Sequence, residues 1–98
     1  ENAMQRSVVD VYIAPIGIEN LMKAIEISKG LRLSGIKVDI DYLDKKLKKN
    51  LEYANSYGIP YVIIIGEDEV KQGKVLFKDM EAGNQELISI EEVIDKIK

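Results

Sequence analysis

Three charged residues in the second half of the sequence have the chemistry needed to recognise an exposed nucleic-acid base. Glu67 and Glu69 follow the apolar run that ends at Gly66, and Lys78 lies in the next apolar segment. A carboxylate accepts hydrogen bonds from base amino and imino groups, whereas an ammonium donates to carbonyl or phosphate oxygens. If Gln72–Gly73 forms a two-residue hairpin turn, the register places Glu67 opposite Lys78. Glu69 then lies on the same face, and the three side chains are predicted to read the Watson–Crick edge of a single-stranded base.

The same charges also have a purely structural interpretation. A Glu–Lys pair across two strands of a solvated hairpin is common, and it stabilises a protein by only about 0 to 1 kcal/mol. On residue chemistry alone, such a surface ion pair is the simpler interpretation of Glu67 and Lys78.

The densest basic patch lies earlier in the chain, at the expected start of a helix. It consists of Lys45, Lys46, Lys48 and Lys49. Because the N–H groups of a helix start favour phosphate, these lysines are predicted to position an RNA backbone. The alternative is a solvated helix face on which Glu52 is a local partner. Asp44 is predicted to cap this helix, and Tyr42, in the turn before it, is the stacking candidate among the tyrosines.

Composition excludes several classes of function. The 98-residue chain contains no Cys and no His, which excludes disulfides, thiolate or imidazole metal sites, and Cys or His nucleophiles. The sequence predicts neither a catalytic residue nor a metal or cofactor. A formal net charge of -3 argues against binding by a general positive surplus, so any RNA contact must be local. The sequence has no apolar run of membrane-spanning length and no signal peptide, which predicts a cytoplasmic protein without a membrane partner.

Hydrophobic patterning predicts the elements that must position these residues. Strands are expected at 8–14, 36–40, 61–65, 74–80 and 86–88, and helices at 18–34, from Asp44 to Gly58 and from Ser89 onward. The segment 67–73 is expected to be a connection or a strand extension. Right-handed crossovers then give a three-layer α/β fold with three helices. Its five-stranded mixed sheet has the parallel order 2-1-3, followed by antiparallel strands 4 and 5.

In such a sheet, ligands collect beyond the carboxyl ends of the parallel strands. That edge comprises the loops 15–19, 41–46 and 66–69. The first loop contains Gly17 but matches neither the G-x-G-x-x-G pattern nor the P-loop, which argues against a nucleotide-binding enzyme. The preceding strand ends in Ile13-Ala14 and therefore lacks the carboxylate expected of a response-regulator phosphoacceptor.

Four segments together resemble the anticodon-binding domain shared by class II aminoacyl-tRNA synthetases for histidine, glycine, threonine and proline. They are 31–39, 47–54, 58–69 and 73–80, followed by Gln85. The Leu-Lys-Lys-x-Leu-x-Tyr-Ala segment and the Lys-Asp-Met ending look most like the histidyl branch. The resemblance implies an anticodon-binding domain at 8–98, with 1–7 a vector remnant or linker. It also implies that a separate catalytic domain performs aminoacylation.

The resemblance implies specific RNA-binding residues. The Glu of the family's Gly-x-x-Glu motif is Glu69, and the basic residue that ends the next strand is Lys78. The polar residue before the second helix is Asp44, where relatives often have Ser or Asn; an acidic group there repels nearby phosphate. The predicted RNA-binding set is Glu69, Lys78, Glu67, Asp44, Lys45, Lys46, Tyr42 and Gly17.

The implied partners are the anticodon stem-loop of tRNA-His, whose anticodon is GUG in the standard code, and the catalytic domain of the parent synthetase. The resemblance also allows a homodimer of the full-length protein. Two other interpretations are kept. One is a regulatory or dimerisation domain of a synthetase-like protein, such as a regulator of histidine biosynthesis or a kinase tail. The other is a flavodoxin-like binder of a small molecule.

Overall fold

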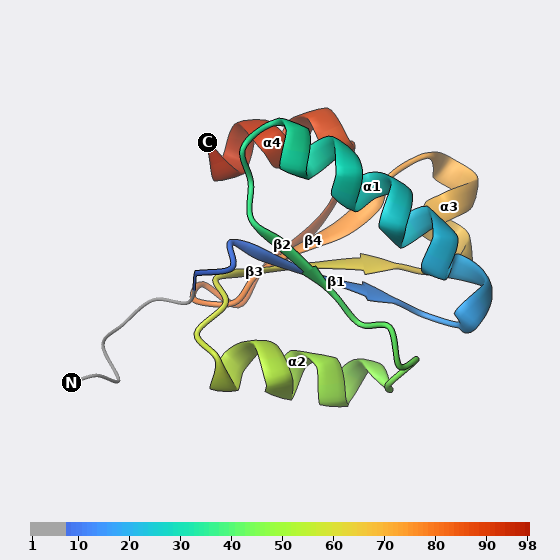
Figure 1. Cartoon of the computed structure of the whole chain (residues 1–98), viewed down its shortest axis with the longest axis horizontal. Coiled ribbons are helices and arrows are strands. Elements are labelled where there is room, and N and C mark those ends of the chain that lie inside the picture. The colour runs from blue at the N-terminus through green and yellow to red at the C-terminus, as the bar shows by residue number, and fades with distance from the viewer. Residues whose placement is uncertain (1–7) are drawn as a thin grey trace.

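A five-stranded mixed sheet forms the centre of the molecule (Figure 1). The computed structural model describes residues 8–98, so the segment 1–7, predicted to be a vector remnant or linker, lies outside the described residues. The strands are β1 (Val11–Pro15), β2 (Val38–Ile40), β3 (Tyr61–Ile65), β4 (Val75–Asp79) and β5 (Gln85–Ile88), in the order β2-β1-β3-β4-β5. β1 pairs in parallel with β2 and β3, whereas β4 is antiparallel to β3 and β5. The predicted fold class and strand order are confirmed.

Helices cover both faces of this sheet and produce three layers. They are α1 (Leu21–Leu33), preceded by the 3-10 turn η2 (Ile18–Asn20), then α2 (Leu47–Ser56), α3 (Glu67–Gln72) and α4 (Ile90–Ile97). α1 and α4 lie over one face and α2 lies over the other (Figure 1). Among the helices of residues 8–98, none has the length and apolar character needed to cross a membrane.

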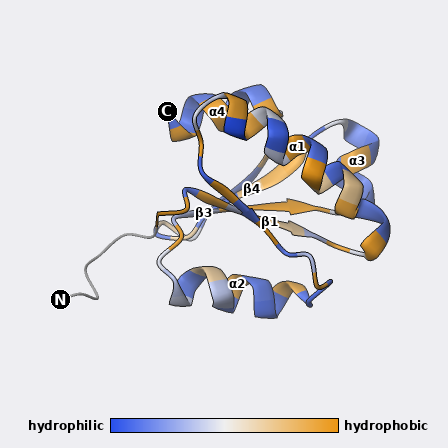
Figure 2. Ribbon diagram, viewed as in Figure 1, coloured by the Kyte–Doolittle hydropathy of each residue, from blue (hydrophilic) through white to orange (hydrophobic). Residues whose placement is uncertain are grey.

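Two hydrophobic clusters hold the layers together, and β3 contributes to both. Ile63 and Ile65 pack under α1 and α4, whereas Val62 and Ile64 pack under α2. Because successive residues of a strand point to opposite faces, a strand covered on both sides needs apolar residues at every position. This explains the unbroken apolar run of β3, and Figure 2 shows the central strands coloured as hydrophobic.

Local signals set the ends of two helices as predicted. Gly35 follows α1 with a φ of 87°, in the left-handed region that favours glycine. At the start of α4, Ser89 Oγ accepts from the N–H of Glu92 at 3.2 Å, and the N–H of Ser89 donates to Glu92 Oε1 at 3.1 Å. The backbone and side-chain hydrogen bonds from Ser89 hold the pKa of Glu92 below its usual range. This capping box confirms the predicted helix start.

The segment after β3 differs from its prediction. Residues Glu67–Gln72 form α3 rather than a connection or strand extension, so the Gln72–Gly73 hairpin is wrong. Acidic residues occupy the first turn of α3, Lys71 lies in its last turn, and Gly73 ends it with a φ of 66°. This charge distribution favours a helix because it complements the helix dipole. The short segment carries no apolar stripe, and patterning alone therefore missed a fourth α-helix.

The start of α2 also differs from its prediction. Asp44 does not cap this helix: Lys46 is the N-cap residue and provides no side-chain hydrogen bond. Asp44 instead has a φ of 53° within the preceding loop. Asp41, at the end of β2, organises that loop by accepting hydrogen bonds from its backbone.

Two glycines of the α1 region should respond to alanine substitution in opposite directions. Gly35→Ala should lower the free energy of unfolding by about 1 to 2 kcal/mol, because Cβ is disfavoured in the left-handed region. Gly30→Ala should raise it by about 0.5 to 1 kcal/mol, because Gly30 is helical and exposed and its added Cβ meets nothing within 4 Å. Urea unfolding followed by circular dichroism measures both changes. A shift of the same sign in both variants would contradict the assignment of the α1 boundary.

Candidate nucleic-acid interface

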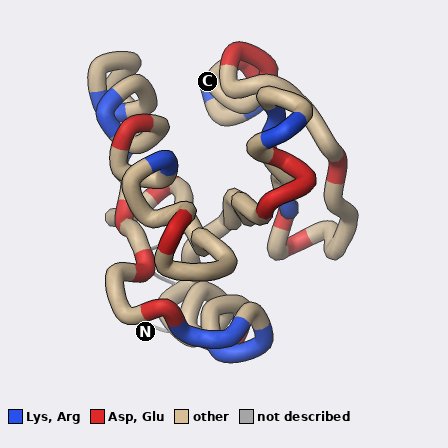
Figure 3. The backbone as a smooth tube through the Cα atoms, turned by 90° about the vertical axis from the view of Figure 1, so that its right-hand side faces the viewer, with Lys and Arg blue, Asp and Glu red and all other residues tan. Residues whose placement is uncertain are grey.

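The loops that follow the three parallel strands form one edge of the molecule, which we call the rim. The rim comprises residues 15–20, 41–46 and 66–69. Backbone hydrogen bonds join its parts to the neighbouring strands: the N–H of Ile16 donates to the carbonyl of Ile65 at 2.8 Å, and that of Asp41 donates to the carbonyl of Ile13 at 3.0 Å. Figure 3 views the molecule from this edge. The edge predicted from strand order and handedness is confirmed.

Three of the sequence-predicted residues lie together on the rim. Gly17, Tyr42 and Asp44 line a shallow depression with Pro15 and Ile18. The side chain of Tyr42 is 53% exposed, and Asp44 is exposed as well. Gly17 has a φ of 90°, and a Cβ at this position would lie 2.6 Å from Glu19 Oε2. The Glu19 carboxylate therefore occupies the space that a Cβ of Gly17 would fill, and the depression presents an aromatic ring beside carboxylates.

Exposed apolar side chains continue this surface. Leu43 is 78% exposed and Ile18 is 61% exposed, although both belong to the large apolar residues that usually pack in cores. Ile18 lines the depression and Leu43 lies between Tyr42 and Asp44 in the chain, so the rim is apolar as well as acidic. Such a surface can stack unpaired bases and can accept hydrogen bonds from their edges.

A buried hydrogen-bond network lies under the loop 41–46. Asp41 is 3% exposed: its Oδ1 accepts from the N–H of Leu43 at 2.8 Å, and its Oδ2 accepts from the N–H of Lys45 at 2.9 Å. Asn50, from α2, is fully buried and donates from Nδ2 to Asp41 Oδ2 at 3.0 Å. Asn50 Oδ1 accepts from the hydroxyl of Tyr12 at 2.9 Å. We call Tyr12, Asp41 and Asn50 the Asp41 network.

Sequence reasoning missed most of this network. It included Asp41 as the first residue of the loop 41–46 and assigned no role to Tyr12 or Asn50, whereas all three are buried. One signal was present: Asn50 occupies the apolar stripe of α2 between Leu47 and Leu51, where a polar residue must find a buried partner.

The hydroxyl of Tyr12 is held in its protonated, donating form. Burial, and then the nearby carboxylate of Asp41, raise the pKa of Tyr12 above its ordinary value. An ionised phenol could not donate to Asn50 Oδ1, so this pKa shift and the hydrogen bond favour the same state.

The predicted basic patch lies beside the acidic centre of the rim, at the start of α2. Figure 3 shows these lysines gathered at one end of the rim. Lys46, Lys48 and Lys49 are exposed. Lys45 differs, because its Nζ lies 4.6 Å from the ring centroid of Tyr53, which in turn packs on Tyr12 with 5.0 Å between centroids. The patch therefore offers exposed ammonium groups for phosphate, with Lys45 held against an aromatic ring.

Glu69 has a structural role at the other end of the rim. Its Oε1 accepts from the N–H of Gly66 at 2.6 Å and so closes the start of α3. A Cβ at Gly66 would lie 2.7 Å from that oxygen, so the carboxylate occupies the space left by a missing side chain. Glu69 is half-buried and Glu67 is exposed. Within residues 8–98, the hydrogen bond to Gly66 uses one oxygen of Glu69, and Oε2 remains to accept from a ligand.

Lys78 does not lie beside these carboxylates. It sits in β4 opposite Val62 of β3 and Gln85 of β5. Val62 precedes Ile65, the last residue of β3, by about 10 Å along the strand, and Glu69 lies beyond that end. The predicted face shared by Glu67, Glu69 and Lys78 is therefore wrong, because a helix replaces the hairpin that would have paired them.

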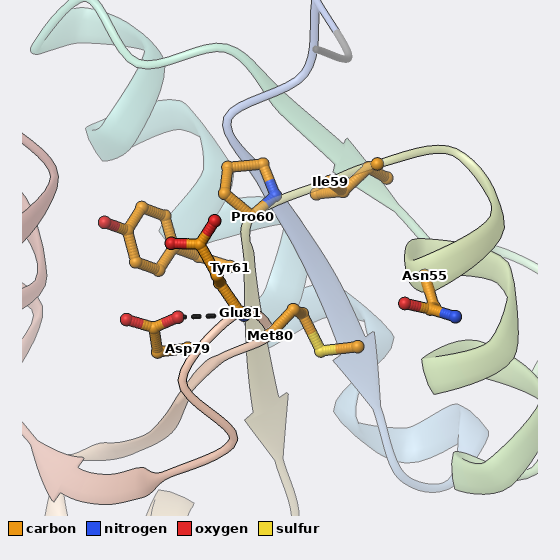
Figure 4. Close-up of a pocket in the computed structure, with 8 residues that line it drawn as sticks. Asn55, Ile59, Pro60, Tyr61, Asp79, Met80 and Glu81 are labelled. Carbon is orange, nitrogen blue, oxygen red and sulfur yellow. Dashed lines mark hydrogen bonds between the residues drawn. The ribbon is translucent and has the colours of Figure 1, made fainter. Parts of the chain in front are cut away.

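A separate hollow lies at the opposite edge of the sheet (Figure 4). Its volume is about 280 Å³, and its lining consists of Asn55, Gly58, Ile59, Pro60, Tyr61, Asp79, Met80 and Glu81. Asp79 Oδ1 accepts from the N–H groups of Glu81 and Ala82, both at 3.0 Å, and so holds the turn between β4 and β5. The sequence-predicted residues do not line this hollow.

Curated relatives of the chain are much longer proteins. The histidine–tRNA ligases of Thermococcus kodakarensis, Pyrococcus furiosus and Finegoldia magna are 41%, 42% and 47% identical to it over 90, 89 and 91 residues. These alignments cover 90%, 91% and 91% of this chain but 21%, 21% and 20% of the relatives. The chain therefore spans about a fifth of the length of these proteins.

Solved structures and a family model agree with these relatives. The histidyl-tRNA synthetase of Nostoc sp. PCC 7120 superimposes with a TM-score of 0.87 at 26% identity, covering 91% of this chain and 21% of that one. The S. aureus histidyl-tRNA synthetase gives 0.83 at 30% identity, with 100% and 28% covered. The family model described as "Anticodon binding domain" matches residues 10–98, which include every strand and helix from β1 to α4. The chain belongs to the family of anticodon binding domains.

Proposed function

We propose that this chain is the anticodon-binding domain of a histidine–tRNA ligase and that its rim recognises the anticodon of tRNA-His. The observation that carries the proposal is its 41% to 47% identity to histidine–tRNA ligases across about nine tenths of the chain. The chemistry of the rim supports it, because base acceptors, a stacking surface and exposed lysines lie along one edge.

Recognition divides between three kinds of contact. Glu69 Oε2, Glu67 and Asp44 accept hydrogen bonds from base amino and imino groups, and Tyr42 stacks on an unpaired base. Gly17 contributes through the shape of its loop, because its φ of 90° favours glycine. Lys46 and its neighbours contact phosphates and position the stem-loop without reading its sequence. Lys78 has no place in this site, because it lies near the other end of β3.

Aminoacylation itself belongs to the remainder of the parent protein. The chain corresponds to about a fifth of its relatives, and its own part in the reaction is to bind tRNA. Its partners are tRNA-His and the catalytic domain of the parent ligase, a cytoplasmic enzyme of protein synthesis. A regulatory or dimerisation role in a synthetase-like protein is not favoured, because the relatives described above are ligases.

Replacing Glu69 by glutamine separates its two roles. Glu69→Gln keeps a carbonyl oxygen for the N–H of Gly66 but replaces the second acceptor by a donor, so α3 should form while base reading is lost. Binding of the tRNA-His anticodon stem-loop should weaken by about 1 to 3 kcal/mol, and the preference over stem-loops with one altered anticodon base should fall. Fluorescence anisotropy with these RNAs measures both effects.

Lys78→Ala is the matched control for this substitution. Lys78 belongs to the predicted RNA-binding set but lies in β4 opposite Val62, away from the rim. The Lys78→Ala variant should therefore bind the anticodon stem-loop with a dissociation constant within about twofold of that of the original chain. If Glu69→Gln binds the stem-loop with unchanged affinity and unchanged anticodon preference, Glu69 does not contact the anticodon. A large loss in Lys78→Ala would place the RNA on a different face.

The exposed lysines should control salt dependence rather than base preference. Lys46→Ala should reduce the slope of log Kd against log salt concentration by about 0.7, the value expected for one lost phosphate contact, and should do so equally for all anticodon sequences. Lys29→Ala, an equally exposed lysine on α1, is the control and should leave the slope unchanged. Titrations at several salt concentrations measure the slopes, and equal slopes for the two variants would argue against phosphate binding at the start of α2.

A further inference from the structure

The Asp41 network connects the interior of the sheet to the rim. Tyr12 projects from β1 and is 2% exposed, Asn50 comes from α2, and Asp41 directly follows β2. The hydroxyl of Tyr12 donates to Asn50 Oδ1, and Asn50 Nδ2 donates both to Asp41 Oδ2 at 3.0 Å and to the carbonyl of Lys45 at 3.2 Å. Three elements and the loop 41–46 therefore meet in one buried set of hydrogen bonds.

Each atom in this network has one compatible role. A carboxylate accepts only, so Asp41 requires donors from the loop and from Asn50. The amide of Asn50 then must direct its nitrogen toward Asp41 and the carbonyl of Lys45, which leaves its oxygen for Tyr12. Within residues 8–98, no buried side-chain nitrogen or oxygen lacks a hydrogen-bond partner. A fully satisfied buried network specifies one arrangement, because any other leaves a polar group unpaired.

That arrangement determines the path of the loop on the rim. The two oxygens of Asp41 hold the N–H groups of Leu43 and Lys45, on either side of Asp44. Asp44 has a φ of 53°, a conformation that L side chains rarely adopt and that persists only when the surroundings fix it. Tyr42 and Asp44 therefore take their positions from a carboxylate that lies beneath them.

We propose that Asp41, Asn50 and Tyr12 are positioning residues for anticodon recognition. They are too buried to touch RNA, and they act by fixing the loop that presents Tyr42 and Asp44. This inference rests on the proposed function and assigns part of the base discrimination to the interior of the domain. The residues that support a recognition site must hold its contacting groups to within about 0.5 Å. The Asp41 network supports Tyr42 and Asp44 in this way.

Asp41→Asn tests the proposal with little change of shape. The amide offers one acceptor where the carboxylate offered two, and its NH2 group must face a loop N–H or the NH2 group of Asn50. Hydrogen exchange should show faster exchange of the Leu43 and Lys45 amides. Binding of the tRNA-His anticodon stem-loop should weaken about tenfold, and discrimination against stem-loops with one altered anticodon base should fall by a similar factor.

Val93→Ala is the control for a general loss of stability. Val93 is fully buried in α4, on the opposite face of the sheet from α2, so its truncation leaves a cavity remote from the loop. At a temperature where all variants are folded, Val93→Ala should bind and discriminate as the original chain does. Tyr12→Phe removes one hydroxyl, keeps the ring, and should cause a smaller loss of discrimination than Asp41→Asn.

The outcomes separate this inference from the proposed function. If the original chain shows no preference for the tRNA-His anticodon, the proposed function fails. If it does and Asp41→Asn discriminates equally well, the function stands and the positioning role is overturned. Equal losses of anticodon discrimination in Asp41→Asn and Val93→Ala also overturn the positioning role, because a general loss of stability would then explain both. If Asp41→Asn does not fold, Tyr12→Phe provides the test. Unchanged anticodon discrimination together with unchanged hydrogen exchange of the Leu43 and Lys45 amides in that variant refutes the proposal.

Discussion

The parallel pairing of β1 with both β2 and β3 is the constraint on which the rest of the structure depends. Right-handed crossovers place α1 and α2 on opposite faces, and the same pairing sends the three strand ends to one edge. The starts of the three helices that follow these strands, α1, α2 and α3, also lie at this edge. This topology brings together carboxylates, an exposed aromatic ring and lysines that are far apart in the sequence. Their proximity does not depend on direct contacts between them.

Elements with a strong apolar pattern were predictable from sequence, and one without such a pattern was not. The apolar run of β3, the alternation of β2 and the Ser89–Glu92 capping box each identify a structure with one physical explanation. The acidic start and left-handed end of α3 are also written in the sequence, but a helix of this length buries little apolar surface. The charged residues of this segment are therefore compatible with both a hairpin and a helix, and the sequence pattern does not distinguish the two.

The site was predictable only where it follows from topology. Strand order brings Gly17, Tyr42 and Asp44 to one edge, and the structure places them there. The residue that pairs with Lys78 depends on how β3 connects to β4. The connection is a helix rather than a hairpin, so Lys78 pairs with Val62 and not with Glu67. Asp41 has the alternation of an exposed strand residue, yet it is buried because Asn50 and the loop backbone supply its donors. Such pairing between distant residues leaves no periodic signal in a single sequence.

The fit between Gly66 and Glu69 has a consequence for interpreting short sequence patterns. The carboxylate fills the space where a Cβ would be and satisfies the first free N–H of α3, so steric and polar complementarity alone justify a Gly-x-x-Glu spacing. Such a spacing would persist in a protein that had lost every nucleic-acid ligand, since drift at either position would unwind a turn. Searches that use this tetrapeptide as a fingerprint therefore detect a way of starting a helix, whether or not the second carboxylate oxygen contacts a ligand.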